Sequence, residues 1–275
     1  MPPRARTVLY LPASNARAVE KARELDVDAV ILDLEDAVAP EAKDAARQAA
    51  VEAARTGGFL GRLGVRVNAL DTEWGETDLT AVADAPFAFV VVPKIERPDH
   101  VAAVSGRLTA KQALWLMIET PHALTWLDGI AATGGPLEAL MLGLNDLALA
   151  LRTGPSPDRE PFKPWLSATV AAARANGLLA IDGVFNRLED EEGLIAEARQ
   201  GRLYGFDGKS LIHPKQINPV RVAFAPTEAE AAWARAVVAA FDDPANAGKG
   251  AVRAAGGMVE RLHLDQARAI LAEVA

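Results

Sequence analysis

The chain has 275 residues, of which 50% are hydrophobic, and its formal net charge at pH 7 is −8. This negative charge argues against nucleic acid as a partner, because nucleic-acid recognition requires a basic surface. Without cysteine the chain has no disulfide, no thiolate metal site and no cysteine nucleophile. Its length suits one α/β barrel as well as two smaller domains.

The apolar segments are too short for targeting or membrane insertion. Val8–Leu11 is shorter than the apolar core of a signal peptide. Phe87–Val92 falls far below the roughly 20 residues that a membrane-spanning helix needs. We therefore expect a soluble cytoplasmic protein without membrane contact.

Short apolar runs alternate with Ala-, Glu- and Arg-rich segments of helical pattern. The expected strands are Val8–Leu11, Ala29–Leu34, Gly64–Asn68, Phe87–Val92, Leu114–Ile118, Ala139–Leu142, Leu178–Ile181 and Leu203–Phe206. The expected helices lie near residues 15–25, 41–55, 77–83, 98–109, 121–132, 160–176, 187–200 and 214–223. Such alternation is typical of a parallel sheet. Eight units of this kind predict a closed (β/α)₈ TIM barrel.

A doubly wound open sheet is the competing architecture. Such a sheet usually has a Gly-rich phosphate turn after its first strand, and here Pro12–Asn15 contains no glycine. The residues after the barrel pattern include two further helices, over Thr227–Phe241 and Leu262–Val274. We expect a catalytic barrel over residues 1–225 and a helical extension over 226–275. The extension serves as a lid or an oligomer arm, or simply packs on the barrel.

Two of the expected strands lead into carboxylates. Leu114–Ile118 runs directly into Glu119, and Leu140–Gly143 is followed, after two residues, by Asp146. A lone charge next to a buried strand is costly without a partner. Because the carboxyl ends of barrel strands share one face, we expect both carboxylates to line one pocket. Oxygen ligands of this kind suit a hard divalent cation such as Mg²⁺.

Further polar residues follow the other expected strands. They are Asp33, Glu35 and Asp36 after the second strand, Arg66 and Asn68 in the third, Lys94 and Glu96 after the fourth, Asn145 after the sixth, Asp182 after the seventh, and Asp207 and Lys209 after the eighth. A ring of carboxylates with three cations among them can hold a metal ion and a small anion together.

Arg66 stands between Val65 and Val67, so its side chain points away from theirs. In a barrel that direction can be the interior, near the top. The guanidinium then either pairs structurally with Asp33 or Glu35, or binds a substrate carboxylate through two hydrogen bonds.

Glu35 and Asp36 have three possible roles: metal ligands, acceptors for the waters of a bound metal, or acids at a helix N-terminus. We favour the second role, because Mg²⁺ keeps several waters that need acceptors. Lys94 is likewise expected to lie near the bound metal without contacting it directly. Lys94 and Lys209 equally suit a structural charge-balancing role.

Seven segments of the chain, taken in order, resemble motifs of the citrate lyase β-subunit-like branch of the HpcH/HpaI aldolase family. The segments are Arg6–Pro12, Ile31–Val38, Val65–Asn68, Val92–Lys94, Ile118–Thr120, Gly143–Leu147, and Gly205–Lys209 with Ile212–Pro214. The resemblance extends from about residue 6 to residue 225.

The resemblance implies a (β/α)₈ barrel lyase that makes or breaks a C–C bond next to a CoA thioester. Glu119 and Asp146 would hold Mg²⁺, and Arg66 and Glu119 would contact the acid substrate. The backbone amides that would meet the substrate carboxylate belong to Gly143, Leu144, Asn145 and Asp146. The family is commonly trimeric, and its C-terminal segment reaches the site of a neighbouring subunit.

Many family members carry an acidic residue in that C-terminal segment, within a Gly-Lys-Met-Ile-Asp-type stretch. The corresponding residues here are Gly-Gly-Met-Val-Glu, so that Glu260 keeps the carboxylate with a longer reach. By this resemblance Glu260 is a candidate catalytic acid.

The expected reaction is cleavage of a 3-hydroxyacyl-CoA of the citryl, malyl or citramalyl kind into an oxo-acid and an acyl-CoA. Mg²⁺ would acidify the substrate hydroxyl, Arg66 would stabilise the enolate oxygen, and Glu260 would protonate the enolate carbon. Thioester hydrolysis, an aldolase reaction on free 2-oxo acids and a non-catalytic role in a multienzyme complex are the alternatives. The acyl carrier is either CoA or an acyl carrier protein.

Overall fold

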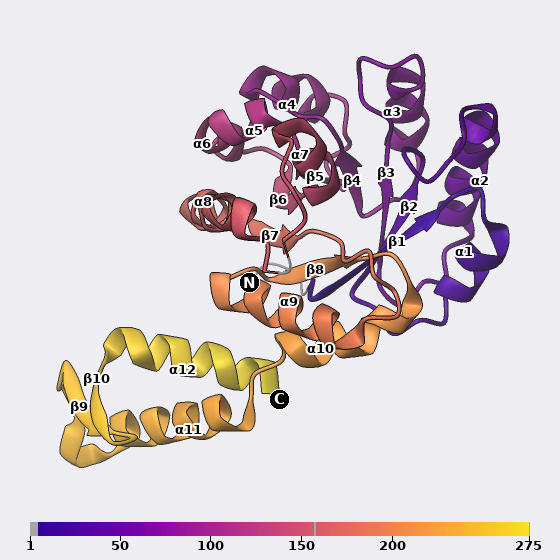
Figure 1. Ribbon diagram of the computed structural model, residues 1–275. Coiled ribbons are helices and arrows are strands. Elements are labelled where there is room, and N and C mark those ends of the chain that lie inside the picture. Colours follow the sequence, from indigo (N-terminus) through magenta and orange to yellow (C-terminus); the bar gives the residue numbers. More distant parts are fainter. Residues whose placement is uncertain (1–4, 157, 275) are drawn as a thin grey trace. The chain divides into compact units, whose positions relative to one another are not determined.

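The computed structural model describes residues 5–156 and 158–274. The chain divides into two compact units, Met1–Ala223 and Phe224–Ala275 (Figure 1). The larger unit is a closed barrel, and the smaller one is a pair of helices joined by a β-hairpin. Within the described residues no helix is both long and apolar enough to span a membrane.

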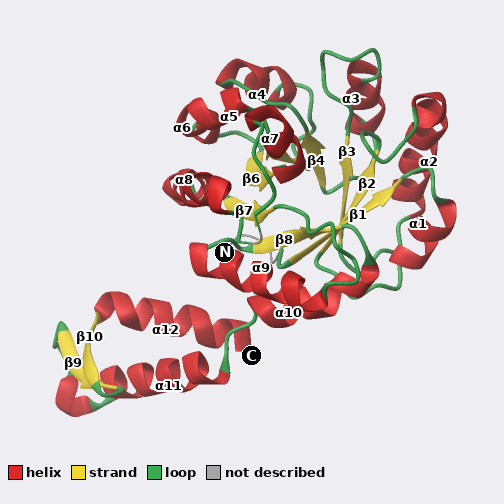
Figure 2. Cartoon of the chain, viewed as in Figure 1, coloured by secondary structure: helices red, strands yellow, loops and turns green. Residues whose placement is uncertain are grey.

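Eight parallel strands form the barrel, each paired with the next along the chain, and β8 pairs with β1 to close it (Figure 2). The strands are β1 (Thr7–Pro12), β2 (Ala29–Asp33), β3 (Arg62–Arg66), β4 (Phe89–Val92), β5 (Ala113–Ile118), β6 (Leu137–Leu142), β7 (Leu179–Asp182) and β8 (Gly208–Leu211). The predicted (β/α)₈ barrel is thereby confirmed.

Helices surround the strands on the outside of the barrel (Figure 1). They are α1 (Ala16–Ala22), α2 (Lys43–Thr56), α3 (Gly75–Ala83), α4 (Pro98–Ser105), α5 (Pro121–Thr125), α6 (Leu127–Ala131), α7 (Leu144–Leu151), α8 (Lys163–Ala175), α9 (Glu191–Tyr204) and α10 (Ile217–Phe224). In α2 the alanines Ala46, Ala50 and Ala53 are buried at helical spacing, and the helix ends at Gly57, whose φ of 67° an L-residue rarely adopts.

The eighth strand differs from the prediction. Leu203 was expected to begin a strand, but it belongs to the last turn of α9 and is 84% exposed. The true strand follows Asp207 and contains Lys209 and Ser210, which are both buried. Because these polar residues interrupt the apolar pattern, the strand was placed one segment too early. Asp207 therefore precedes the strand instead of following it.

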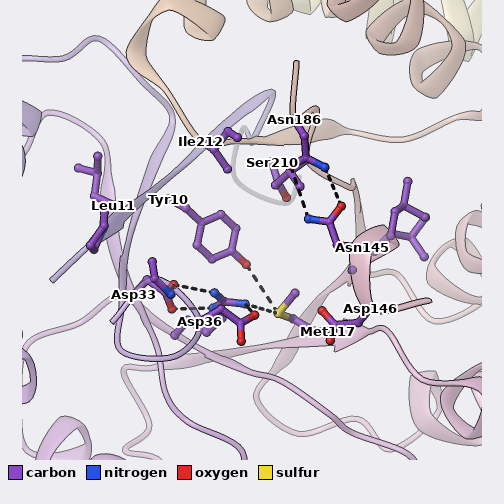
Figure 3. A pocket seen from close by; sticks show the side chains of 17 residues that line it. Tyr10, Leu11, Asp33, Asp36, Met117, Asn145, Asp146, Asn186, Ser210 and Ile212 are labelled. Atoms are coloured by element: carbon purple, nitrogen blue, oxygen red, sulfur yellow. Dashed lines mark hydrogen bonds and ion pairs between the residues drawn. The ribbon is translucent and has the colours of Figure 1, made fainter. Parts of the chain in front are cut away.

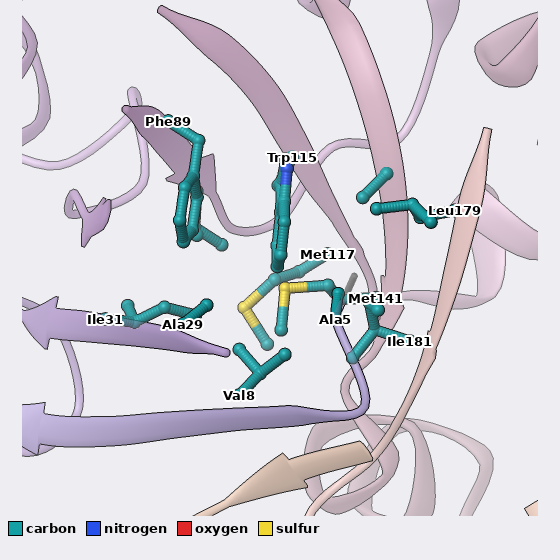
Figure 4. Packing of buried hydrophobic residues seen from close by; sticks show 12 residues of the cluster. Ala5, Val8, Ala29, Ile31, Phe89, Trp115, Met117, Met141, Leu179 and Ile181 are labelled. Atoms are coloured by element: carbon teal, nitrogen blue, oxygen red, sulfur yellow. The ribbon is translucent and has the colours of Figure 1, made fainter. Parts of the chain in front are cut away.

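Large side chains fill the amino-terminal half of the barrel interior. The rings of Phe89 and Trp115 stack with their centroids 4.0 Å apart, and Met117 and Met141 pack nearby (Figure 4). Gly64 makes room for this stack, since a Cβ atom there would lie 2.2 Å from the Phe89 ring. The interior is thus closed at this end, and space for a ligand is left at the carboxyl ends of the strands.

The smaller unit contains α11 (Glu228–Asp242), a hairpin of β9 (Ala251–Ala254) and β10 (Gly257–Glu260), and α12 (Arg261–Val274). Thr227 begins α11 with a capping box. Val252 and Val259 of the hairpin are buried together with Ala234, Val237 and Ala267 of the two helices.

Both helices of the smaller unit were predicted, but the hairpin was not. Its strands have only four residues each, too few for a clear alternating pattern. The turn between them uses Ala255 and Gly256 with φ values of 49° and 81°. Such a turn, with positive φ at both central residues, usually carries Asn or Gly at its first position, and alanine gives no indication of it.

Candidate active site

A cavity of about 340 Å³ opens at the carboxyl ends of the barrel strands (Figure 3). Strand ends contribute Asp33, Arg66, Met117 and Ser210 to its wall, and Gly143 with the first turn of α7 contributes residues 143–146. Of the residues expected at the rim, Asp36, Arg66 and Asp146 line this cavity. Glu119, which was expected to line it with Asp146, is instead buried against Gly143 of the wall. Function in barrels of this kind collects at this end.

Arg66 is held in the cavity wall by carboxylates. Its Nε and one terminal nitrogen donate to the two oxygens of Asp33 at 2.7 and 2.6 Å, and the other terminal nitrogen lies 2.7 Å from Glu35 Oε2. The ring of Tyr10 covers the guanidinium at 5.0 Å. Burial by itself lowers the pKa of Arg66, but the charge and hydrogen bonds of Asp33, together with Tyr10 and Glu35, outweigh burial and raise the pKa well above its usual value. Arg66 therefore forms the expected structural ion pair with Asp33 and also lines the cavity.

Glu35 is a buried acid whose proton is retained to an unusually high pH. Burial raises the pKa of Glu35 from 4.5 to about 8, against the lowering effect of the Arg66 charge. Asp36, the next residue, is exposed and lies on the cavity wall. Only the first of these two neighbouring carboxyl groups is therefore shielded from water.

Glu35→Gln is expected to remove a pH dependence of stability. Since the folded-state pKa lies above the unfolded one, the folded protein binds more protons between pH 4.5 and about 8, and stability falls as the pH rises through this range. A neutral Gln mimics the protonated acid, so the variant should gain stability relative to the parent at pH 9 and little at pH 5. Urea unfolding at both pH values measures the difference, and equal differences would contradict the buried acid.

Glu119 and Asp146 converge on one cation, the ammonium of Lys94. Lys94 Nζ lies 3.5 Å from Glu119 Oε1 and forms an ion pair with Asp146, and the Lys94 backbone N–H donates to Glu119 Oε1 at 2.8 Å. Glu119 is 1% exposed, and burial raises its pKa. Its second oxygen, Oε2, is buried without a hydrogen-bond partner. The two strand-end carboxylates thus meet at Lys94, although only Asp146 lines the cavity, and their role as metal ligands stays a prediction.

Gly143 lies against Glu119 at the start of α7. Its N–H donates to the Ile118 carbonyl at 3.1 Å, which joins the ends of β5 and β6. A Cβ atom at Gly143 would stand 2.5 Å from Glu119 Oε2. The first N–H groups of α7 have no partner within the helix, and they belong to the residues that line the cavity.

Gly143→Ala is expected to weaken divalent-cation binding by about tenfold. The new methyl group would displace the buried Glu119 carboxylate, and loss of a contact that positions a metal ligand costs about this much affinity. Gly154→Ala is the matched control, since a Cβ atom there meets nothing within 4 Å. Calorimetric titration of both variants with Mg²⁺ measures the effect. Equal affinities would show that Gly143 does not fix Glu119.

Three residues expected at the rim lie elsewhere. Asp182 and Lys209 point outward from the barrel, where Asp182 pairs with Arg159 at 2.7 Å and Lys209 Nζ lies 2.7 Å from Glu197 of α9. Asp207 pairs with Arg174 before β8 begins. Alternate strand residues face opposite sides, and the short runs before these residues do not reveal which side is the interior.

Several cavity residues were not singled out by the sequence. Tyr10 and Met117 point inward between the charged groups, and Tyr10 O–H lies 3.9 Å from the Met117 sulfur. Ser210 and Asn186 line the opposite wall. The polar Ser210 inside a strand was the one available indication. Asn186 stands in a loop, and no spacing distinguishes it.

Glu260 belongs to the smaller unit, at the end of β10. Its side chain is exposed, and its backbone N–H donates to His263 Nδ1 at 2.9 Å. Among residues 5–156 and 158–274 no group of three or more His, Asp or Glu side chains is placed to hold a metal. A pair of carboxylates matches the one or two that Mg²⁺ commonly takes from a protein.

Comparisons with known proteins agree with this architecture. The model of the family HpcH/HpaI aldolase/citrate lyase matches residues 6–214. A (3S)-malyl-CoA thioesterase of Cereibacter sphaeroides is 43% identical over 98% of this chain and 94% of its own length. Citrate lyase subunit beta of Escherichia coli is 35% identical over 97% of this chain and 92% of its own.

The crystal structure of CitE from Mycobacterium tuberculosis, in complex with magnesium, acetoacetate and coenzyme A, is 34% identical, covers 98% of both chains and superposes with a TM-score of 0.83. The residues that the family model matches include all seven segments on which the sequence resemblance rests, and they end before the C-terminal extension. The chain belongs to the HpcH/HpaI aldolase/citrate lyase family.

Proposed function

We propose that this protein is a Mg²⁺-dependent lyase that cleaves the C–C bond of a 3-hydroxyacyl-CoA, of the citryl, malyl or citramalyl kind, into a 2-oxo acid and an acyl-CoA. One observation carries the proposal: two carboxylates converge on a single cation, and one of them, Asp146, lines the same cavity as the buried Arg66. Family membership and the ligands of the CitE complex, which are magnesium, a keto acid and coenzyme A, support it.

The residues present fit a magnesium ion. Glu119 Oε2 is buried with no partner, and Glu119 and Asp146 already share the Lys94 ammonium. Hard oxygen ligands of this kind are the ones that Mg²⁺ prefers. Glu119 and Asp146 would hold the ion, with Glu35, Asp36 and Lys94 around it. When bound, Mg²⁺ withdraws electron density from the carboxylate and hydroxyl oxygens of the substrate.

The chain's own groups then have distinct tasks. The free amides at the start of α7, from Leu144 to Asp146, bind the substrate carboxylate, whereas the Gly143 N–H, which was also expected to do so, is occupied by the Ile118 carbonyl. Arg66, fixed by Asp33, opposes the negative charge that develops on the thioester oxygen. The C–C bond breaks with its electron pair moving into the thioester enolate, the hydroxyl carbon becomes the carbonyl of the oxo-acid, and a carboxylic acid protonates the enolate carbon. One proton is lost from the hydroxyl and one is gained at carbon.

A panel of 3-hydroxyacyl-CoA substrates incubated with the protein and Mg²⁺ tests the proposal. A 2-oxo acid and an acyl-CoA should appear in equal amounts, and chelation of Mg²⁺ should stop their release. Release of neither product from any member of the panel would overturn the proposal.

Thioester hydrolysis is the second candidate, favoured by the 43% identity to a (3S)-malyl-CoA thioesterase. In that reaction water adds to the thioester carbonyl, the C–S bond breaks, and a hydroxy acid and free CoA thiol leave. The same panel separates the two reactions, because only hydrolysis releases a free thiol. Free 2-oxo acids offered as aldolase substrates test the aldolase alternative.

We further propose that the acyl carrier is CoA, that an acyl carrier protein can replace it, and that the protein works as a homotrimer.

Glu260→Ala is expected to slow turnover about 100-fold while leaving oxo-acid binding unchanged, because a missing general acid affects the proton transfer and not the binding. Glu273→Ala, in α12, is the control for a carboxylate lost from the same unit. Full activity in the Glu260 variant would remove it from the mechanism.

A site shared between subunits has its own test. When the Glu260→Ala variant is mixed and refolded with a variant lacking Arg66, mixed oligomers should regain part of the activity, since some sites then combine intact residues from both chains. No recovery, together with mixed oligomers in the sample, would contradict a contribution of Glu260 to a neighbouring site.

A further inference from the structure

A second cavity, of about 560 Å³, adjoins the one described above. Its lining includes the apolar side chains of Ala148, Phe162 and Phe185. Four residues line both cavities and therefore form the wall between them: Leu144, Asn145, Val184 and Asn186.

The wall is closed at its rim by a contact between two amides. Asn186 Nδ2 donates to Asn145 Oδ1 at 2.7 Å, while the reverse contact is 3.5 Å long (Figure 3). In the same wall Leu144 packs on Gly183, where a Cβ atom would lie 2.9 Å from Leu144 Cγ. Both amides are exposed to water, so a single hydrogen bond separates the two cavities at the rim.

The loop that carries Asn186 is held by two buried donors. Lys209 Nζ donates to the Gly183 carbonyl at 2.6 Å, and Gln216 Nε2 donates to the Phe185 carbonyl at 2.9 Å. These bonds fix the backbone of residues 183–185, which directly precede Asn186. The amide pair is therefore formed from groups that the fold has already positioned.

The charges of the second cavity favour an uncharged occupant. The two arginines that line it are both paired, Arg159 with Asp182 at 2.7 Å and Arg187 with Asp190 at 2.9 Å. A carboxylate entering this space would lose water without gaining an unpaired cation, which is unfavourable. An alkyl group would instead meet the aromatic and alanine side chains.

We propose that Asn186 determines specificity: its hydrogen bond to Asn145 closes the acid-binding cavity and limits the substituent on the hydroxyl-bearing carbon of the substrate to hydrogen or methyl. Among the three candidate substrates this limit selects the malyl and citramalyl kinds and excludes the citryl kind, whose substituent is a carboxymethyl group. This inference rests on the proposed function. The cavity of about 340 Å³ also has to hold the carboxylate and the thioester end, so a longer substituent needs the adjoining space. Removal of the amide joins the two cavities and admits longer, uncharged chains.

The test compares the parent protein with Asn186→Ala on 3-hydroxyacyl-CoA substrates that carry hydrogen, methyl, ethyl or propyl at that carbon. The ratio of kcat/KM for ethyl over hydrogen should rise about tenfold or more in the variant, the scale on which a pocket discriminates one methylene. Calorimetric binding of the matching 2-oxo acids should show the same trend. Asn176→Ala, which removes an amide at the end of α8, is the matched control and should leave both ratios unchanged.

A second substitution checks where the longer chain goes. Ala148→Leu fills the adjoining cavity without altering the acid-binding one, so it should reverse the gain when added to Asn186→Ala. An unchanged ratio in Asn186→Ala, or a gain that Ala148→Leu leaves intact, would overturn the proposal. If the parent protein cleaves no thioester at all, the proposed function fails, and the binding series of 2-oxo acids still decides whether Asn186 forms the wall.

Discussion

Glu119→Gln is expected to abolish Mg²⁺ binding and to lower kcat/KM roughly a thousandfold, corresponding to about 4 kcal/mol of lost metal-ion stabilisation. The glutamine keeps the shape of the side chain and can still accept from the Lys94 N–H, whose bond to Oε1 is 2.8 Å long. What disappears is the negative charge. The barrel should therefore fold normally while the metal site is lost.

Glu138→Gln provides the matched control for this variant. Glu138 lies in β6, the strand that pairs with β5, but it accepts from Trp115 Nε1 and pairs with Arg62 at the opposite end of the barrel from Glu119. Its substitution should leave Mg²⁺ affinity unchanged. Calorimetric titration and circular dichroism are measured on both proteins. An unchanged Mg²⁺ affinity in Glu119→Gln would remove Glu119 from the metal site.

Arg66→Lys is expected to lower kcat/KM by about 10²–10³-fold with a smaller change in Mg²⁺ affinity, the usual cost of losing one preorganised donor to a developing oxyanion. A lysine keeps the charge but cannot reproduce the paired bonds to Asp33 at 2.7 and 2.6 Å. The cation would no longer be fixed where the thioester oxygen is expected. The kinetic loss should therefore fall mainly on kcat.

Arg62→Lys is the control on the same strand. Arg62 begins β3, where it pairs with Glu138 at 2.8 Å, while Arg66 ends it. The control should keep its activity. Arg66→Met, in contrast, leaves Asp33 buried with no cation and should also destabilise the fold by about 3–5 kcal/mol. Normal kcat in Arg66→Lys would assign Arg66 a purely structural pairing.

The sequence predicted the parts of the site in which buried strands end at charged groups. Glu119 and Asp146 follow uninterrupted apolar runs, and a charge in that position needs a partner. Arg66 was identified because it interrupts a run of valines. In each case a local pattern was sufficient, since the barrel brings all strand ends to one rim.

Other features depend on contacts between distant segments, and the sequence did not reveal them. The direction of Asp182 is set by Arg159, and Lys209 is buried against α9. The Asn145–Asn186 pair joins the first turn of α7 to a loop 41 residues further along the chain. The position of the eighth strand was wrong for a local reason, because buried polar residues replaced the apolar run.

The ammonium of Lys94 has a consequence for how the carboxylates respond to ions. Glu119 and Asp146 already neutralise part of their charge against it. A divalent ion that binds the same oxygens must therefore displace the Lys94 ammonium, which is tethered to the chain. It does not enter a site that only water occupies. Its apparent affinity is then the difference between two attractions. Free amines and monovalent salt should displace Lys94 from the two carboxylates only weakly, because the tethered ammonium has a far higher local concentration than either.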